Sequence, residues 1–143
     1  MTTADPRLSF VAELAVTIAE PYMIGNVGPG IREVIPITGG TVTGPRLNGI
    51  VLPGGADWCL TRPDGICDIW ARYTLKTDDG VLISLINAGT CRQDAGGNFV
   101  GKTVPQFEVA EGPYTWLRHG HFVGTLLTDA GGTLARARLY EVM

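Results

Sequence analysis

One short segment combines two glycines, a carboxylic acid and a large aromatic ring. The run Pro53-Gly54-Gly55-Ala56-Asp57-Trp58 delivers the acid and the indole together. A carboxyl group beside a large apolar ring tends to have a raised pKa, which suits proton transfer near neutral pH. Asp57 is therefore a candidate general acid or base, with Trp58 as a wall for an apolar substrate. The structural alternative is a tight turn in which Asp57 bonds to its own backbone.

Three further side chains could stabilise negative charge on a substrate. Arg32 follows a glycine-rich loop and could hold a carboxylate or an enolate oxygen through two hydrogen bonds. Tyr22 and Tyr73 could each donate a phenolic hydrogen bond to a developing oxyanion. Each has a structural alternative, because the arginine could pair with Glu20 or Glu33 at the surface and the tyrosines could belong to the core.

The predicted strand from Ile66 carries charged residues on one face only. Side chains alternate along a strand, so Asp68 and Arg72 share a face with Trp70, and Tyr73 lies on the other face. If the charged face lines a polar cavity, the acid and the arginine set each other's ionisation, and the arginine could position Asp57. If that face is solvated, the pair contributes little to stability. The second alternative is slightly favoured.

The histidines and the third tryptophan lie close together near the C-terminus. His119 and His121 share a face if the segment is a strand, but the sequence marks no further metal ligands near them. We therefore predict no metal site and keep His121 as a candidate substrate contact. Trp116 is a candidate aromatic wall for the substrate or, alternatively, a rim residue.

The sequence lacks the signatures of several cofactor and nucleophile enzymes. Gly25-Asn26-Val27-Gly28 does not match the dinucleotide fingerprint, and the sequence contains no phosphate-binding loop. No serine lies in a Gly-x-Ser-x-Gly elbow. We expect no cofactor, which leaves cofactor-free proton-transfer chemistry or ligand binding.

Composition indicates one globular domain over residues 1–143. Hydrophobic residues make up 45% and charged residues 17% of the chain, and the net charge of -3 argues against a nucleic-acid partner. No apolar run is long enough for a transmembrane helix, so we expect no membrane association. The segment Met1–Pro6 does not resemble a secretory signal, so a cytoplasmic location is expected. If the chain assembles, a homodimer is the expected form.

The three cysteines, Cys59, Cys67 and Cys91, are odd in number and do not match the spacing of a metal motif. They are predicted to be reduced and to act as small apolar side chains.

Glycine and proline point to the elements that must position these residues. The 20 glycines and 9 prolines are spread over the whole chain, as expected for short strands joined by turns. The clearest hairpin joins 66–77 to 81–92, and another joins 121–128 to 133–143. The other predicted strands are 8–19, 31–43, 46–52, 56–60 and 105–110, with loops at 22–30 and 93–102 and a helical turn or short strand at 114–118.

These elements predict an all-β fold. About eight or nine strands joined by short turns favour a small antiparallel barrel of the up-and-down, lipocalin-like type, because closure removes exposed strand edges. A barrel of this size can hold one small ligand. A two-sheet β-sandwich is the alternative.

Several short motifs follow a pattern shared by one protein family. They are Gly39-Gly40-Thr41-Val42-Thr43-Gly44-Pro45, Gly49, Pro53-Gly54-Gly55-Ala56-Asp57-Trp58, Ala71-Arg72-Tyr73, Thr77-Asp78-Asp79-Gly80, Gly89 and Tyr114-Thr115-Trp116-Leu117. From Arg32 onward, the chain resembles the domain of unknown function 3237 family, whose members are small single-domain β-barrel proteins. The resemblance implies a fold but no reaction. It also implies that Arg32, Asp57, Trp58, Arg72 and Tyr73 line one pocket.

Three functions remain open, and we favour the first. It is a cofactor-independent lyase or isomerase, carrying out hydration, dehydration or retro-aldol chemistry on a small carbonyl-bearing, aromatic or polyketide-like molecule. Asp57 would move the proton, Arg32 or Tyr73 would hold the oxyanion, and Trp58 and Trp116 would pack on the substrate. The second function is a non-catalytic small-molecule carrier or sensor. The third is a structural or assembly protein that dimerises through a barrel edge, with an interior filled by its own side chains and no cavity.

Overall fold

Short turns divide the chain into strands that pair with their neighbours. The structure is a computed structural model, and it describes residues 4–143. Its strands are β1 (Leu8–Ile18), β2 (Tyr22–Asn26), β3 (Ile31–Thr43), β4 (Gly49–Val51), β5 (Gly55–Thr61), β6 (Cys67–Thr77), β7 (Leu82–Gln93), β8 (Phe99–Glu108), β9 (Phe122–Thr128) and β10 (Leu134–Val142). The short helix α1 (Trp116–His119) precedes β9. The described part of the chain contains no helix that is long and apolar enough to cross a membrane.

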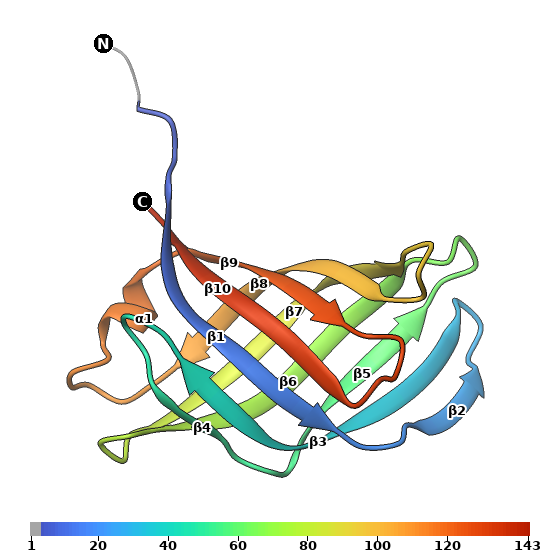
Figure 1. Ribbon diagram of the computed structural model, residues 1–143, viewed down its shortest axis with the longest axis horizontal. Helices are drawn as coiled ribbons and strands as arrows, with labels where there is room; N and C mark the ends of the chain where they lie inside the picture. The colour runs from blue at the N-terminus through green and yellow to red at the C-terminus, as the bar shows by residue number, and fades with distance from the viewer. Residues whose placement is uncertain (1–3) are drawn as a thin grey trace.

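The strands form a closed antiparallel barrel (Figure 1). From β6 to β10, each strand pairs with the next, and β10 then pairs with β1. The ring closes because β1 also pairs with β3, and β4 and β5 pair one after the other with both β3 and β6. The result is an eight-stranded barrel with extra strands. The predicted barrel is therefore confirmed, and the sandwich alternative is wrong.

The two predicted hairpins form in the expected register. β6 pairs with β7 around the turn that contains Gly80, whose φ of 89° suits glycine. β9 and β10 pair in the same way. Two predicted loops are wrong in part, because 22–30 contains β2 and 93–102 contains the start of β8. β2 is held by its backbone pairing with β3 and leaves most side chains exposed, so hydrophobic alternation could not identify it.

Alternation along the strands separates the barrel interior from its outer face. In β6, every second residue from Cys67 to Leu75 is buried, including Tyr73, whereas Trp70 is 41% exposed. Asp68 and Arg72 share the outward-facing side with Trp70. The charged face of this strand therefore faces solvent and does not line a polar cavity.

Helix α1 closes one end of the barrel. Its Leu117 is buried, and Trp116 lies 6.2 Å, between ring centroids, from Phe122. The Arg46 guanidinium lies 4.1 Å from the centroid of the Trp116 ring and 2.6 Å from a carboxylate oxygen of Glu141. These contacts attach the helix to the barrel at the end away from the β9–β10 turn (Figure 1).

The prediction of three reduced cysteines is wrong, because Cys59 and Cys67 form a disulfide and Cys91 is free and buried. β5 and β6 are neighbouring strands, and the two cysteines point into the barrel with their Cα atoms 6.4 Å apart. Cysteine spacing along the chain does not show this contact, which only the pairing of the two strands creates.

Close approach of neighbouring strands requires glycine at Gly89. A methyl group there would collide with the backbone of Lys102 on β8. We expect Gly89→Ala to lower the free energy of unfolding by roughly 1–3 kcal/mol, as overpacking does. Urea denaturation measures the change. Gly131→Ala is the control, since its nearest neighbour atom would be 3.6 Å away. Equal stability of the two variants would contradict the tight contact.

The disulfide gives a second prediction. The non-reduced protein should be lighter by two hydrogens than the reduced protein in intact-mass measurement. Reduction should lower the free energy of unfolding by about 2–4 kcal/mol, the usual effect of a native disulfide. The double variant Cys59→Ser, Cys67→Ser should not respond to reductant, whereas Cys91→Ser should respond as the wild type does. A response in the double variant would argue against this pairing.

Candidate active site

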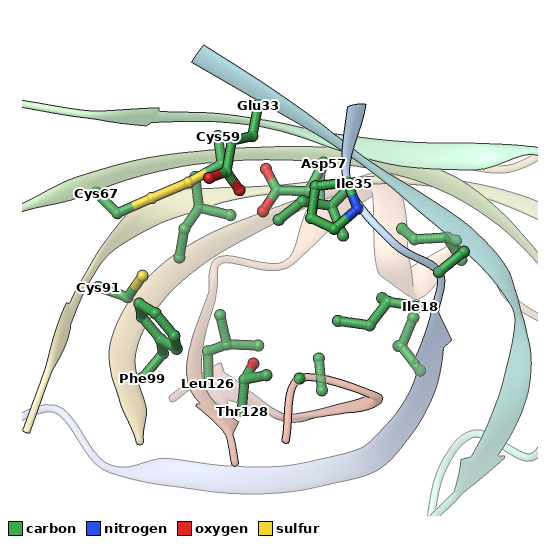
Figure 2. Close-up of a pocket in the computed structure, with 18 of the residues that line it drawn as sticks. Ile18, Glu33, Ile35, Asp57, Cys59, Cys67, Cys91, Phe99, Leu126 and Thr128 are labelled. Carbon is green, nitrogen blue, oxygen red and sulfur yellow. A yellow bond between two sulfur atoms is a disulfide. The ribbon is translucent and has the colours of Figure 1, made fainter. Parts of the chain in front are cut away.

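A cavity of about 520 Å³ opens at the barrel end opposite α1. The end of β1, the segment after it and the β9–β10 turn form its mouth, and strands β3, β5, β6 and β7 contribute walls. Most lining side chains are apolar, including Val16, Ile18, Ile35, Ile37, Ile69, Phe99, Leu126 and Ala135 (Figure 2). The volume lies within the usual range for small-molecule sites.

Asp57 points into this cavity from β5. Backbone pairing between β5 and β6 is interrupted after Asp57 and resumes at Leu60. In this gap, the backbone N–H of Trp70 donates a 3.0 Å hydrogen bond to Oδ1 of Asp57. The carboxylate therefore replaces a backbone acceptor in the ladder between two strands. The alternative of a local turn that bonds to its own backbone is not what the structure shows.

Burial raises the pKa of Asp57 from its usual 3.8 to about 6. The hydrogen bond from Trp70 and the charge of Arg32 oppose this shift, and the charge of Glu33 adds to it. Loss of solvent penalises the charged carboxylate more than these contacts favour it. Asp57 is thus a carboxyl group that can gain or lose a proton near neutral pH.

Tyr73 lines the same cavity from the neighbouring strand β6 and is 5% exposed. Burial raises the pKa of its hydroxyl, hydrogen bonding with the Asn87 side chain opposes the shift, and the charge of Asp57 adds to it. The phenol therefore stays protonated at neutral pH and keeps a proton to donate. Tyr73 and Asp57 are the two predicted catalytic residues that the structure brings together.

Two acidic residues of the cavity were missed as site residues in the sequence. Glu33 lines the wall on β3, and Glu20 lies at the mouth after β1. Glu33 alternates with Ile35 and Ile37, which also face the cavity. This alternation was the available signal, but it does not tell which side of the strand faces inward.

Arg32, Trp58 and Arg72 do not line the cavity with Asp57 and Tyr73. The Arg32 side chain donates a 2.9 Å hydrogen bond to the carbonyl oxygen of Trp58. Trp58 is 39% exposed, with its ring centroid 5.6 Å from that of Trp70. On the exterior of the barrel, Nη2 of Arg72 lies 3.5 Å from Oε1 of Glu108. A shared strand does not imply a shared face, which is why the expected five-residue pocket does not form.

The remaining candidates also lie elsewhere. On the outer face, Oδ1 of Asp68 lies 3.8 Å from Nε of Arg62. Tyr22 lies on β2 and is 70% exposed. Trp116 and His121 belong to the α1 end of the barrel, where His121 borders a smaller depression. His119 is exposed at the end of α1. No cluster of three potential metal ligands occurs among residues 4–143.

Several bacterial proteins are similar to this chain over most of its length. A UPF0311 protein of Rhodopseudomonas palustris (strain TIE-1) is 32% identical over 141 residues, which cover 90% of this chain and 92% of that protein. A UPF0311 protein of Clostridium acetobutylicum is 36% identical over 127 residues, which cover 79% of this chain and 80% of that protein. The crystal structure of a beta-barrel like protein from Acinetobacter baumannii has a TM-score of 0.92 at 30% identity, and covers 99% of both chains.

A fungal protein is more distantly similar. A hydroalkoxylation enzyme of Penicillium herquei is 24% identical over 120 residues, which cover 84% of this chain and 74% of that enzyme. The crystal structure of an enzyme from the same fungus has a TM-score of 0.77 at 21% identity, covering 100% of this chain and 98% of that one. This second comparison shows a common fold.

The barrel, the cavity and these similarities agree with a family match that covers residues 6–142. The chain belongs to the family described as Protein of unknown function (DUF3237).

Proposed function

We propose that this protein is a cofactor-independent lyase. It adds the oxygen and the proton of a hydroxyl group across a C=C bond, or eliminates them again to restore that bond. The substrate is a small carbonyl-bearing molecule, aromatic or polyketide-like, bound in the barrel cavity. One observation carries the proposal, which is the protonatable carboxyl of Asp57 inside a mostly apolar cavity. The distant similarity to a hydroalkoxylation enzyme supports the same reaction class.

The proposed addition uses Asp57 twice. As a carboxylate, it takes the proton of the attacking hydroxyl while the oxygen forms a bond to the β-carbon of an enone. The π electrons move to the carbonyl oxygen, and this enolate accepts a hydrogen bond from the Tyr73 hydroxyl. The protonated Asp57 then returns its proton to the α-carbon. Elimination is the same sequence in reverse, and Asp57 ends each cycle as it began.

A pKa of about 6 suits both roles of Asp57. A general acid–base group works best when its pKa lies near the working pH, since both protonation states are then accessible. Tyr73 suits the oxyanion role because its buried hydroxyl remains a hydrogen-bond donor. The apolar walls strengthen that hydrogen bond by keeping the local dielectric low.

The apolar cavity would also suit a carrier or sensor, which is the second candidate function. A carrier would bind its ligand tightly without forming product and would tolerate Asp57→Asn. The two functions therefore separate on turnover and on the effect of one substitution.

Asp57→Asn is expected to remove turnover while leaving the fold intact. A suitable probe is 2′-hydroxychalcone, whose phenol adds to the β-carbon of its own enone with a loss of absorbance that can be followed directly. The variant should be slower by about 10²–10⁴-fold, the usual contribution of a general acid–base group. Asp68→Asn is the matched control, because it makes the same change on the outer face. Turnover that survives Asp57→Asn would overturn the assigned role.

The raised pKa of Asp57 also predicts how stability depends on pH. The folded protein holds this proton up to about pH 6, whereas the unfolded chain releases it near the usual value of 3.8. The folded state binds more protons between these values, so the contribution of Asp57 to stability falls as pH rises through this range, by up to about 3 kcal/mol.

Urea denaturation of the wild type and Asp57→Asn across this pH range measures the effect. The free energy of unfolding of the wild type should fall relative to that of the variant as pH rises. Parallel curves would show that the pKa of Asp57 is not raised in the folded protein.

A further inference from the structure

The charged side chains of the cavity are all acidic. Glu20, Glu33 and Asp57 line it, and no lysine or arginine is among its lining residues in the described part of the chain. The nearest candidate cation, Arg32, is directed to the carbonyl of Trp58. A bound ligand therefore meets no lysine or arginine side chain in the cavity wall, although the charge of Arg32 acts on Asp57 from outside it.

Glu33 is placed to act on a ligand that reaches Asp57. Asp57 pairs with Ile35 across β3 and β5, and Cys59 pairs with Glu33, so the two acids are diagonal neighbours. Both side chains lie on the same cavity wall (Figure 2). Their charges interact, because Glu33 helps to raise the pKa of Asp57. No ion pair with a lysine or arginine neutralises Glu33 or Glu20 within residues 4–143.

We propose that Glu33, with Glu20 at the mouth, excludes from the cavity molecules that carry a carboxylate. This inference rests on the proposed function, because it names the substrate class of the same site. A carboxylate entering the cavity would lose water and meet like charges within an apolar wall, and both effects weaken binding. An uncharged carbonyl or hydroxyl group avoids the repulsion and can still bond to Tyr73.

An amine substrate is disfavoured for a chemical reason. An ammonium group beside Asp57 would favour its ionised form and lower its pKa. The carboxyl would then return its proton to carbon less readily, which opposes the second step of the proposed addition. Electrostatic attraction would nevertheless favour binding of such a cation in the acidic cavity. The experiment therefore includes an ammonium probe.

Three probes with one ring system and different charges test the proposal. They are naphthylmethanol, naphthoate and naphthylmethylammonium, titrated into the wild-type protein at neutral pH by isothermal titration calorimetry. We expect the alcohol to bind at least about ten-fold more tightly than the carboxylate, the size of a like-charge repulsion across several ångströms of a partly solvated site. The ammonium should bind at least as tightly as the alcohol, because the acidic side chains of the cavity attract it.

Substitution at Glu33 assigns the effect to one residue. Glu33→Gln should strengthen binding of naphthoate several-fold and change binding of naphthylmethanol less than about two-fold, because only the carboxylate loses a repulsion. Glu108→Gln is the matched control, since Glu108 lies on the outer face beside Arg72. It should leave both affinities unchanged, which separates a local effect from a change in net charge.

Each contrary result has a distinct meaning. Equal binding of alcohol and carboxylate, or no effect of Glu33→Gln on naphthoate, would overturn the exclusion of anions and leave the proposed lyase reaction standing. An ammonium probe that binds as weakly as the carboxylate would show that the charge of the acidic residues does not set the selectivity, and would also overturn the exclusion of anions. If none of the three probes binds, the cavity does not accept aromatic molecules of this size, and the substrate of the proposed function is overturned as well.

Discussion

The barrel depends on β1, which pairs with β10 on one side and with β3 on the other. Without this strand, both neighbours would present unpaired backbone groups at an open edge, and the interior would be exposed to water. Val11, Ala12 and Leu14 of β1 are fully buried, so the strand that closes the hydrogen-bond ring also fills the core. The end of the same strand, from Val16 onward, contributes to the wall and mouth of the cavity. Closure and cavity formation thus both depend on one strand, β1, and its two pairings.

Inside this closed ring, the chemistry of the cavity follows from one carboxyl group that has lost most of its water. Asp57 takes the place of a backbone acceptor and holds the N–H of Trp70, which fixes its position between two strands. Burial nevertheless outweighs this hydrogen bond in setting its pKa. A buried acid destabilises the folded protein at neutral pH, and such a cost is common at functional sites. The same environment keeps the Tyr73 hydroxyl protonated beside it.

The two ends of the barrel are built differently. At one end, the cation–π contact between Arg46 and Trp116 and the ion pair between Arg46 and Glu141 hold α1 in place. At the other end, the β9–β10 turn, the end of β1 and the segment after it form the mouth of the cavity. Aromatic residues near the C-terminus therefore support the fold, and the acidic residues of β3 and β5 face the cavity. An aromatic residue type alone does not distinguish these uses.

The sequence by itself determined the strand-rich fold and the hairpins, because turn residues and strand alternation are local properties. It also singled out Asp57 as a candidate acid or base. Two of its four predicted catalytic residues, Asp57 and Tyr73, lie in the cavity, whereas Arg32 and Arg72 do not line it. Alternation groups residues into faces, but only barrel closure decides which face is interior. For the same reason, the cavity position of Glu33 and the Cys59–Cys67 disulfide were settled by tertiary structure, where strand pairing places residues that are apart in sequence on one wall.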